Sequence, residues 1–112
     1  MLGKGENKAM KYNKSEAKEF AQENFKGIFA AGMTPFKADN STDEEGLRSN
    51  LHHWIDELNI DGLFVNGKQG EFFSMTLAER KRQFEIVVEE VGERCRTIMS
   101  CSDENLDTVL EL

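Results

Sequence analysis

The chain has 112 residues, 38% of them hydrophobic, and a formal net charge of −7. This length suits one small domain with its own core, since domains commonly run from about 50 to 250 residues. The acidic excess lies in residues 27–112, which hold 17 acidic and 8 basic side chains, and it argues against nucleic acid as a partner. The sequence shows neither an apolar run of the roughly 20 residues that a membrane helix needs nor the apolar core of a secretory signal. We therefore expect a cytoplasmic protein that binds neither nucleic acid nor a membrane.

Residues 1–26 are predicted to form an extension that precedes the domain proper in residues 27–112. The first 13 residues are rich in Gly, Lys, Asn and Glu, a composition typical of poorly ordered segments. Lysines and glutamates alternate at helical spacing, which indicates a solvated helix face rather than a nucleic-acid arm. Asn13, followed three residues later by Glu16, is a helix-start signal. We expect a short helix there that packs across one end of a sheet.

Three short apolar runs recur at a nearly constant interval and predict parallel strands. They start 35 and 34 residues apart, and helical periodicity fills the sequence between them. This alternation is typical of repeated strand–helix units, and the interval matches one βαβ step of about 30 residues or more. The predicted strands are Ile28–Ala31, Leu63–Val65 and Thr97–Met99.

Two helices are predicted between these strands, each with a capping-box start. Thr42 with Glu45 begins the first, and Thr76 with Glu79 begins the second. Gly92 is expected to end the second helix. The apolar stripe predicted for the first helix is Leu47, Leu51, Trp54, Ile55 and Leu58. The stripe predicted for the second is Leu77, Phe84, Val87, Val88 and Val91.

The predicted units make an incomplete fold. A three-stranded parallel sheet covered on one side leaves apolar strand faces and both edges without partners, and a third helix begins only near Asp103. A closed (β/α)₈ barrel has about 250 residues. We therefore predict an α/β chain that forms three β/α units of a (β/α)₈ barrel after a short helical extension, either as a fragment or as one part of an assembly.

Two loops follow the predicted strands at their carboxyl ends, where barrels of this kind bind ligands. The first, residues 33–36, contains Thr34 and the single proline of the chain. The second, residues 67–71, reads Gly-Lys-Gln-Gly-Glu. Its two glycines allow a tight turn with exposed amide groups, which suits an anionic oxygen. It matches neither of the glycine motifs that bind nucleotides, so the sequence favours a small-anion site.

Other chemistry-bearing residues receive structural interpretations. His52 and His53 are adjacent and point about 100° apart on a helix, whereas metal ligands are spaced at i and i+4, so we interpret them as helix surface. Cys95 and Cys101 lack the CxxC spacing, and we expect reduced structural thiols and no metal site. Packing or subunit contacts are predicted for the three apolar residues Phe72, Phe73 and Met75.

Five motifs, in order and spacing, resemble a single family. They are Thr34-Pro35-Phe36, the Thr42–Glu45 helix start, Ile60–Leu63, the G-x-x-G-E turn and the Thr76–Arg80 helix start. From about Gly27 to Leu112 the chain is similar to the dihydrodipicolinate synthases and N-acetylneuraminate lyases. The resemblance implies a (β/α)₈ barrel without a cofactor, assembled as a homodimer or homotetramer. It also implies a lyase or aldolase that cleaves or condenses 2-oxo acids such as pyruvate through a lysine imine.

The resemblance assigns the G-x-x-G-E turn to the carboxylate of the 2-oxo acid. The substrate-binding residues it implies are Thr34, Gly67, Lys68, Gln69 and Gly70. Family members normally carry two small hydroxyl residues where this chain has Lys68 and Gln69, and the first of them joins a proton relay with a tyrosine. A lysine ammonium donates but does not accept, so standard dihydrodipicolinate synthesis is not the expectation. Lys68 can instead bind a second acidic group on a larger substrate, and Glu71 is expected to support the turn by capping local amides.

The resemblance places the imine-forming lysine and its tyrosine beyond Leu112. We therefore predict no catalytic residue within this chain, which is expected to be inactive alone, and Tyr12 is not a substitute. For Lys68, anion binding, a solvated loop lysine and an imine nucleophile stay open, the last needing a depressed pKa. Two other functions stay open as well: a non-catalytic member or fragment that senses a ligand or serves assembly, and a sugar-acid dehydratase with the same imine chemistry.

Overall fold

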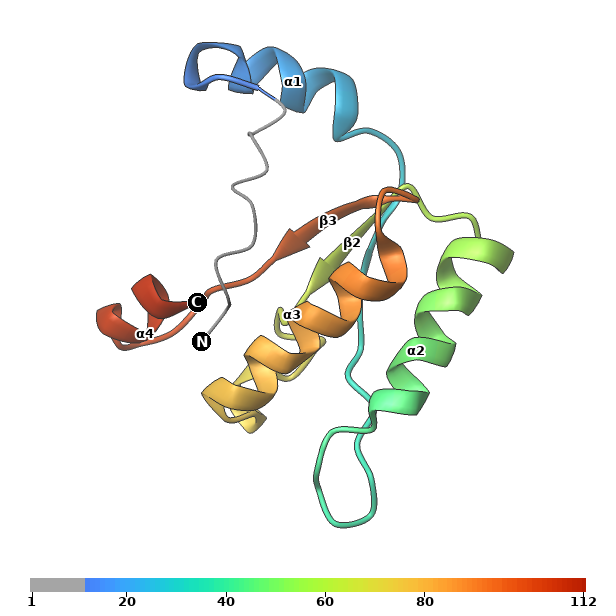
Figure 1. Cartoon of the computed structure of the whole chain (residues 1–112), viewed down its shortest axis with the longest axis vertical. Helices are drawn as coiled ribbons and strands as arrows, with labels where there is room; N and C mark the ends of the chain where they lie inside the picture. The colour runs from blue at the N-terminus through green and yellow to red at the C-terminus, as the bar shows by residue number, and fades with distance from the viewer. Residues whose placement is uncertain (1–11) are drawn as a thin grey trace.

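A computed structural model describes residues 12–112 and shows a three-stranded parallel sheet with helices on one face (Figure 1). Most of the segment predicted to be poorly ordered, residues 1–11, lies outside the described residues. The strands are β1 (Phe29–Ala31), β2 (Gly62–Val65) and β3 (Arg96–Met99), in that order across the sheet. Each is within one residue of its predicted bounds, and the three predicted β/α units are confirmed.

Four α-helices accompany the strands in the described part of the chain. They are α1 (Ala17–Asn24), α2 (Glu44–His52), α3 (Leu77–Val91) and α4 (Leu106–Glu111). A 3₁₀ turn, Lys14–Glu16, leads into α1, and a second, Phe72–Ser74, follows β2. Between residues 12 and 112 no helix has the length and apolar character needed to span a bilayer.

The hydrophobic core lies between the sheet and the pair α2 and α3 (Figure 1). Leu63 and Val65 on β2 point toward the helices, so the intervening Phe64 faces the other side. The core residues are Leu47, Leu51, Ile55, Leu63, Val65, Ile86, Val87 and Val91. On the side that α2 and α3 do not cover, Ile98 of β3 remains 40% exposed. The predicted one-sided covering of the sheet is therefore confirmed for the described residues.

Helix α2 begins one residue later than the capping box predicted. Thr42 forms an isolated antiparallel bridge with Phe36 and is therefore extended rather than a cap. Asp43 caps the helix instead, and its Oδ1 accepts a hydrogen bond from the Gly46 amide at 3.0 Å. The carboxylate reaches the third amide of the first turn, which is the bond that the threonine was expected to supply.

Two residues of the predicted stripes were wrongly assigned to the core. Leu58 is 59% exposed because the helix continues past His52 as a π-helix, His53–Glu57, whose wider turn rotates Leu58 away from the core. Val88 is 61% exposed, whereas Ile86, absent from the predicted stripe, is buried. The other start and stop signals of α3 are confirmed: Thr76 and Glu79 form the capping box, and Gly92, with φ of 55°, ends the helix.

Helix α1 packs across the amino-terminal end of the sheet, as predicted. Phe20 stacks beneath the guanidinium of Arg96, the first residue of β3, at 5.4 Å from the ring centroid. Phe25 stacks on Phe29, the first residue of β1, at 5.9 Å. Tyr12 was placed in a flexible head by the sequence, but its ring stacks on Phe20 at 4.4 Å. It lies at the end of the sheet opposite the candidate site.

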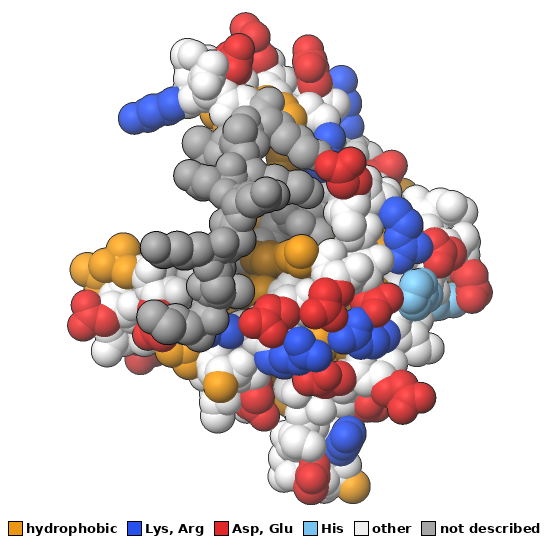
Figure 2. Space-filling view, viewed as in Figure 1, with side chains coloured by type: hydrophobic (Ala, Val, Ile, Leu, Met, Phe, Trp, Pro, Cys, Tyr) orange, Lys and Arg blue, Asp and Glu red, His pale blue; other side chains and the backbone are white. Residues whose placement is uncertain are grey.

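Ion pairs cover the outer faces of α2 and α3, where Figure 2 shows acidic and basic side chains intermixed. Arg48 on α2 bonds to Glu89 and Glu90 on α3, and the bond to Glu90 holds the pKa of that carboxyl below its ordinary value. Arg82 joins Glu44 in the same way at 2.9 Å and lowers its pKa. These exposed pairs hold the helices in register but contribute little stability individually.

Candidate functional site

The candidate site lies where the carboxyl ends of the three strands meet. Parallel strands bring all three following loops to one edge of the sheet. Thr34 follows β1, residues 67–71 follow β2, and residues 100–105 follow β3. The structure thus brings together the two loops that the sequence singled out, and it adds a third.

The turn at residues 67–71 is closed by its own backbone. The Gly70 amide donates to the Gly67 carbonyl at 3.1 Å, and the Glu71 amide donates to the Lys68 carbonyl at 3.0 Å. Because N–H and C=O point in opposite directions across a trans peptide, the amides of Lys68 and Gln69 are directed away from those two bonds. Neither amide has a hydrogen-bond partner among residues 12–112. The turn therefore offers two adjacent N–H groups to an anion.

The residues of the turn divide into two kinds. Lys68 and Gln69 are exposed, and Gly67 and Gly70 are buried. A Cβ on Gly70 would lie 3.1 Å from the Gly32 carbonyl oxygen and 3.2 Å from the Asn66 Cα, so any other residue would have to push these backbones apart by a few tenths of an ångström. The ammonium of Lys68 has no ion-pair partner in the part of the chain that the structure describes. It is free to meet a ligand above the turn.

Thr34 supports the turn from below. The residue is only 6% exposed, and its hydroxyl donates to the Gly70 carbonyl at 2.6 Å. The same oxygen accepts a hydrogen bond from Nε2 of Gln83, on α3, at 2.9 Å. A direct bond from Thr34 to a substrate stays a prediction, but its contact with the turn is a feature of the fold.

Glu71 does not support the turn in the way that was expected. Its carboxylate caps no amide among residues 12–112, and the residue is exposed. The backbone supplies the support instead, because Glu71 adopts a left-handed conformation with φ of 55°. In this conformation its amide bonds to Lys68 and its carbonyl accepts from the Ser74 amide at 2.9 Å. The predicted capping role was wrong, and the residue matters for the path of the chain.

A buried polar cluster beneath the loops was missed by the sequence analysis. Arg80 is 2% exposed on α3 and donates to Oδ2 of Asp103 at 3.1 Å and to the Ser102 carbonyl at 2.8 Å. Its guanidinium also lies 5.0 Å from the centroid of the Phe72 ring. Asn66 is fully buried and donates to the Arg80 carbonyl at 3.3 Å. Helix α3 thereby holds the loops after β2 and β3 together.

The signal for this cluster was present in the sequence. Arg80, Gln83 and Val87 follow one another at spacings of three and four, so the two polar residues extend the buried stripe of α3 toward its amino terminus. Asp103, predicted as the start of a helix, instead pairs with Arg80 and accepts from the Asn105 amide at 2.9 Å. Helix α4 consequently starts after Asn105.

A groove opens beside the cluster at the same edge of the sheet. Its lining includes Phe72, Phe73, Met75, Arg80 and residues 102–104. Met75 is buried and Phe72 packs under Arg80, which fits the packing role predicted for both. Phe73 is 68% exposed, so it packs little within this chain.

The predicted histidine and cysteine interpretations have mixed outcomes. His52 and His53 lie on the helix surface, as predicted, where His52 contacts Glu90 at 2.9 Å and His53 contacts Glu57 at 2.9 Å. Both cysteines are free thiols. Cys95 packs against the core, and burial raises the pKa of its thiol. Cys101 is exposed and therefore has no packing role of the kind expected.

Comparisons with known proteins agree with this geometry. The Dihydrodipicolinate synthetase family model matches residues 24–112. The N-acetylneuraminate lyase of Fusobacterium nucleatum is 39% identical over 87 residues, which cover 78% of this chain and 30% of that protein. The chain therefore spans about 30% of the length of the curated relatives it matches.

Solved structures show the same partial correspondence. The structure of CdNal from Clostridium difficile, in complex with mannosamine, is 38% identical, with a TM-score of 0.75 over 77% of this chain and 30% of that chain. YagE, a prophage protein of the dihydrodipicolinic acid synthase family from E. coli K12 in complex with pyruvate, is 29% identical, with a TM-score of 0.73 over 78% and 29% of the two chains. From the family match, the shared strand order and the likeness to these barrels, we conclude that the chain belongs to the dihydrodipicolinate synthetase family and forms three β/α units of its (β/α)₈ barrel.

Proposed function

We propose that this chain supplies the carboxylate-binding turn of a lyase or aldolase that acts on a 2-oxo acid through a lysine imine. The observation that carries the proposal is the pair of amides at the exposed residues Lys68 and Gln69, which have no hydrogen-bond partner among residues 12–112 and lie at the carboxyl edge of a parallel sheet. Two adjacent N–H donors match the two oxygens of a carboxylate. The family relatives include lyases and a protein solved with pyruvate, which supports this substrate class.

The proposed chemistry divides between this turn and a lysine elsewhere in the barrel. The turn holds the carboxylate, so that the adjacent 2-oxo carbon is fixed in position for attack by the lysine amine. The amine nitrogen bonds to that carbon, and the carbonyl oxygen leaves as water, with one proton from the amine and one from solvent, so that the imine keeps its N–H and is positively charged. The protonated imine then accepts the electron pair of the neighbouring bond as that bond breaks. This chain contributes orientation and charge complementarity to those steps. The proposal includes a cytoplasmic homodimer or homotetramer, in which the exposed Phe73 suits a subunit contact.

The proposal is tested by trapping the imine with borohydride. The polypeptide that carries this chain is incubated with pyruvate, and then with a panel of other 2-oxo acids, before reduction and mass spectrometry. A stable adduct on a lysine outside residues 1–112 is the expected result. Residues 1–112 alone serve as the matched control and are expected to give none. If no 2-oxo acid in the panel gives an adduct, the lysine-imine function is contradicted.

Replacing Lys68 by methionine is expected to weaken diacid binding more than monoacid binding. The exposed ammonium has no ion-pair partner in the described chain and lies beside the amides of the turn, so it can pair with a second acidic group. An exposed charge pair contributes about 1 kcal/mol or less, which corresponds to a change of at most roughly fivefold. The measurement is the concentration of 2-oxoglutarate or pyruvate that gives half-maximal adduct.

The control for Lys68 is Lys37→Met, which removes another exposed lysine from the loop after β1. It is expected to change neither concentration. Equal losses for both acids in the Lys68→Met variant would remove the proposed role and leave Lys68 as a solvated loop lysine.

A non-catalytic family member is the second candidate function. The specific observation in its favour is that Lys68 and Gln69 occupy the positions where the family normally has two small hydroxyl residues. Neither side chain reproduces a hydroxyl that both donates and accepts a proton. In this case the turn still binds a carboxylate, and isothermal titration with pyruvate detects binding although borohydride traps nothing. A sugar-acid dehydratase differs only in substrate, and the same panel, extended with sugar acids, separates it.

A further inference from the structure

We propose that Gln83 is a positioning residue, which acts through Thr34 to hold the turn at residues 67–71 in the conformation that presents two amides to the substrate carboxylate. The inference rests on the proposed function of that turn. Gln83 lies on α3, outside both loops, and it is 4% exposed. Gln83 belongs to none of the five sequence motifs.

Gln83, Thr34 and Gly70 are joined by two hydrogen bonds, and the donor and acceptor of each bond are fixed. Thr34 has a single hydroxyl hydrogen, and this hydrogen is directed to the Gly70 carbonyl at 2.6 Å, much closer than the Met75 sulfur at 4.0 Å. The Thr34 oxygen can therefore only accept from Gln83, so the nitrogen rather than the oxygen of the Gln83 amide must face it, at 2.9 Å. The side-chain amide of Gln83 thus fixes the orientation of the Thr34 hydroxyl, and this hydroxyl fixes the position of the Gly70 carbonyl in the turn.

These two hydrogen bonds control the direction of the N–H groups of the turn. The bond from Thr34 orients the peptide that joins Gly70 to Glu71, and that peptide donates its N–H to the Lys68 carbonyl. With its carbonyl held there, Lys68 directs the Gln69 amide outward. Loss of the bond to Gly70 would free this peptide to rotate. The two N–H groups would then no longer be held toward one anion.

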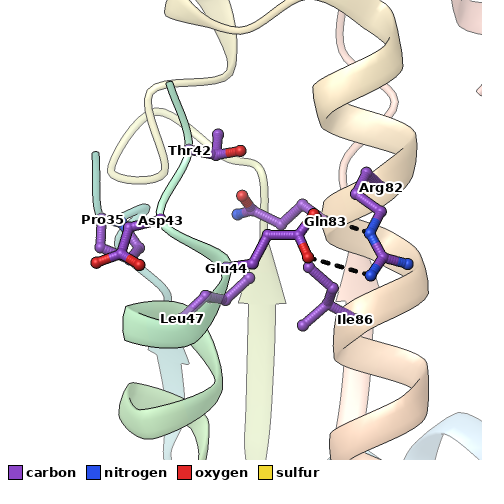
Figure 3. Close-up of a pocket in the computed structure, with 8 residues that line it drawn as sticks. All are labelled: Pro35, Thr42, Asp43, Glu44, Leu47, Arg82, Gln83 and Ile86. Atoms are coloured by element: carbon purple, nitrogen blue, oxygen red, sulfur yellow. Dashed lines mark hydrogen bonds and ion pairs between the residues drawn. The ribbon is translucent and has the colours of Figure 1, made fainter. Parts of the chain in front are cut away.

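The packing around Gln83 allows its hydrogen bond to be tested separately from its shape. Its Oε1 is buried and has no hydrogen-bond partner among the described residues, which is a cost to the fold. Figure 3 shows the side chain extending from α3 toward the segment that carries Thr42, beside a small cavity that Leu47 and Ile86 also line. Methionine has the same unbranched shape and no such oxygen. A Gln83→Met variant therefore separates the hydrogen bond from the packing.

The test measures binding and turn order separately in the full-length polypeptide. In Gln83→Met, the pyruvate concentration for half-maximal borohydride adduct is expected to rise about tenfold, which equals about 1.4 kcal/mol. The adduct formed at saturating pyruvate and the urea midpoint are expected to match the wild type. Hydrogen exchange at the Gly70 and Glu71 amides should become faster. Exchange at the amides of α3 beyond Gln83 should not change.

A double-mutant cycle tests whether Gln83 acts through Thr34. Thr34→Val alone is expected to give a similar rise, and the double variant about the same tenfold rather than the hundredfold product. Arg82→Met, which removes a neighbouring surface ion pair of α3, is the matched control and is expected to leave the half-saturating concentration unchanged.

The outcomes separate this inference from the proposed function. A hundredfold product in the double variant, or unchanged half-saturation in Gln83→Met, overturns the positioning role. If the wild type traps no 2-oxo acid at all, the proposed function fails, and hydrogen exchange alone then decides. Faster exchange at Gly70 and Glu71 in Gln83→Met supports the control of the turn, and unchanged exchange overturns it.

Discussion

Replacing Leu51 by alanine is expected to lower the free energy of unfolding by about 2–5 kcal/mol. Leu51 is 0% exposed and lies on α2 within the core formed with β2 and α3. The substitution removes apolar surface from the interior and leaves a cavity that the helices on one face of the sheet can only partly fill. Urea unfolding of the full-length protein, followed by circular dichroism, measures the change as a lower midpoint with an unchanged slope.

Leu58→Ala is the matched control for this prediction. The side chain follows Leu51 by seven residues, so an uninterrupted α-helix would bury both, but Leu58 is 59% exposed. Its removal is expected to change the free energy of unfolding by no more than about 0.5 kcal/mol. Similar losses for the two variants would contradict the π-helical rotation at His53–Glu57.

Replacing Asp103 by alanine is expected to destabilise the protein by about 1–3 kcal/mol, because it leaves a buried hydrogen-bond donor without its partner. The side chain of Arg80 is 3% exposed, and Asp103 is the carboxylate that pairs with it at 3.1 Å. Without that carboxylate the guanidinium stays buried with the Ser102 carbonyl as its remaining polar partner in the described chain. The same urea titration measures the loss. Proteolysis of the loop at residues 100–105 should become faster as well, because Arg80 no longer holds it.

Two companion variants show whether the buried charge is the cause. Glu104→Ala removes the neighbouring carboxylate, which is exposed and has no ion pair among residues 12–112, and a change within about 0.5 kcal/mol is expected. Arg80→Met combined with Asp103→Ala removes both charges and is expected to recover most of the stability, since an apolar replacement of a buried pair is often neutral. A double variant as unstable as Asp103→Ala would assign the loss to the loop itself.

The strands and the order of the elements could be predicted because each depends on a local pattern that tertiary contacts did not override. The apolar runs at β1, β2 and β3 agree with the structure to within one residue. The capping box at Thr76 and Glu79 also formed as predicted. The capping box predicted at Thr42 did not form, because Thr42 pairs with Phe36 in an antiparallel bridge and is therefore extended. Local signals thus hold where no partner from elsewhere in the chain competes.

The position of the candidate site could be predicted from the sequence, but the hydrogen bonds that hold its loops in place could not. The glycine spacing at positions 67 and 70 indicated a turn with free amides, and the structure leaves those of Lys68 and Gln69 unpartnered in the described chain. The bond from Gln83 to Thr34 spans 49 positions of sequence, and no local pattern contains it. Likewise, Arg80 appears in the sequence as one more surface cation. Its burial depends on Asp103 and Phe72, which only the assembled loops bring together.

The strand order has a consequence for how the protein is made. In the described sheet, strands that are consecutive along the polypeptide are also neighbours, so that Phe29 pairs with Gly62 and Gly62 pairs with Arg96. Each pairing therefore closes a loop of similar, modest length, whose entropic cost is small and does not grow along the chain. A ribosome that releases one unit at a time can let each new strand dock on the edge left by the previous one. Synthesis and assembly can accordingly proceed in the same direction.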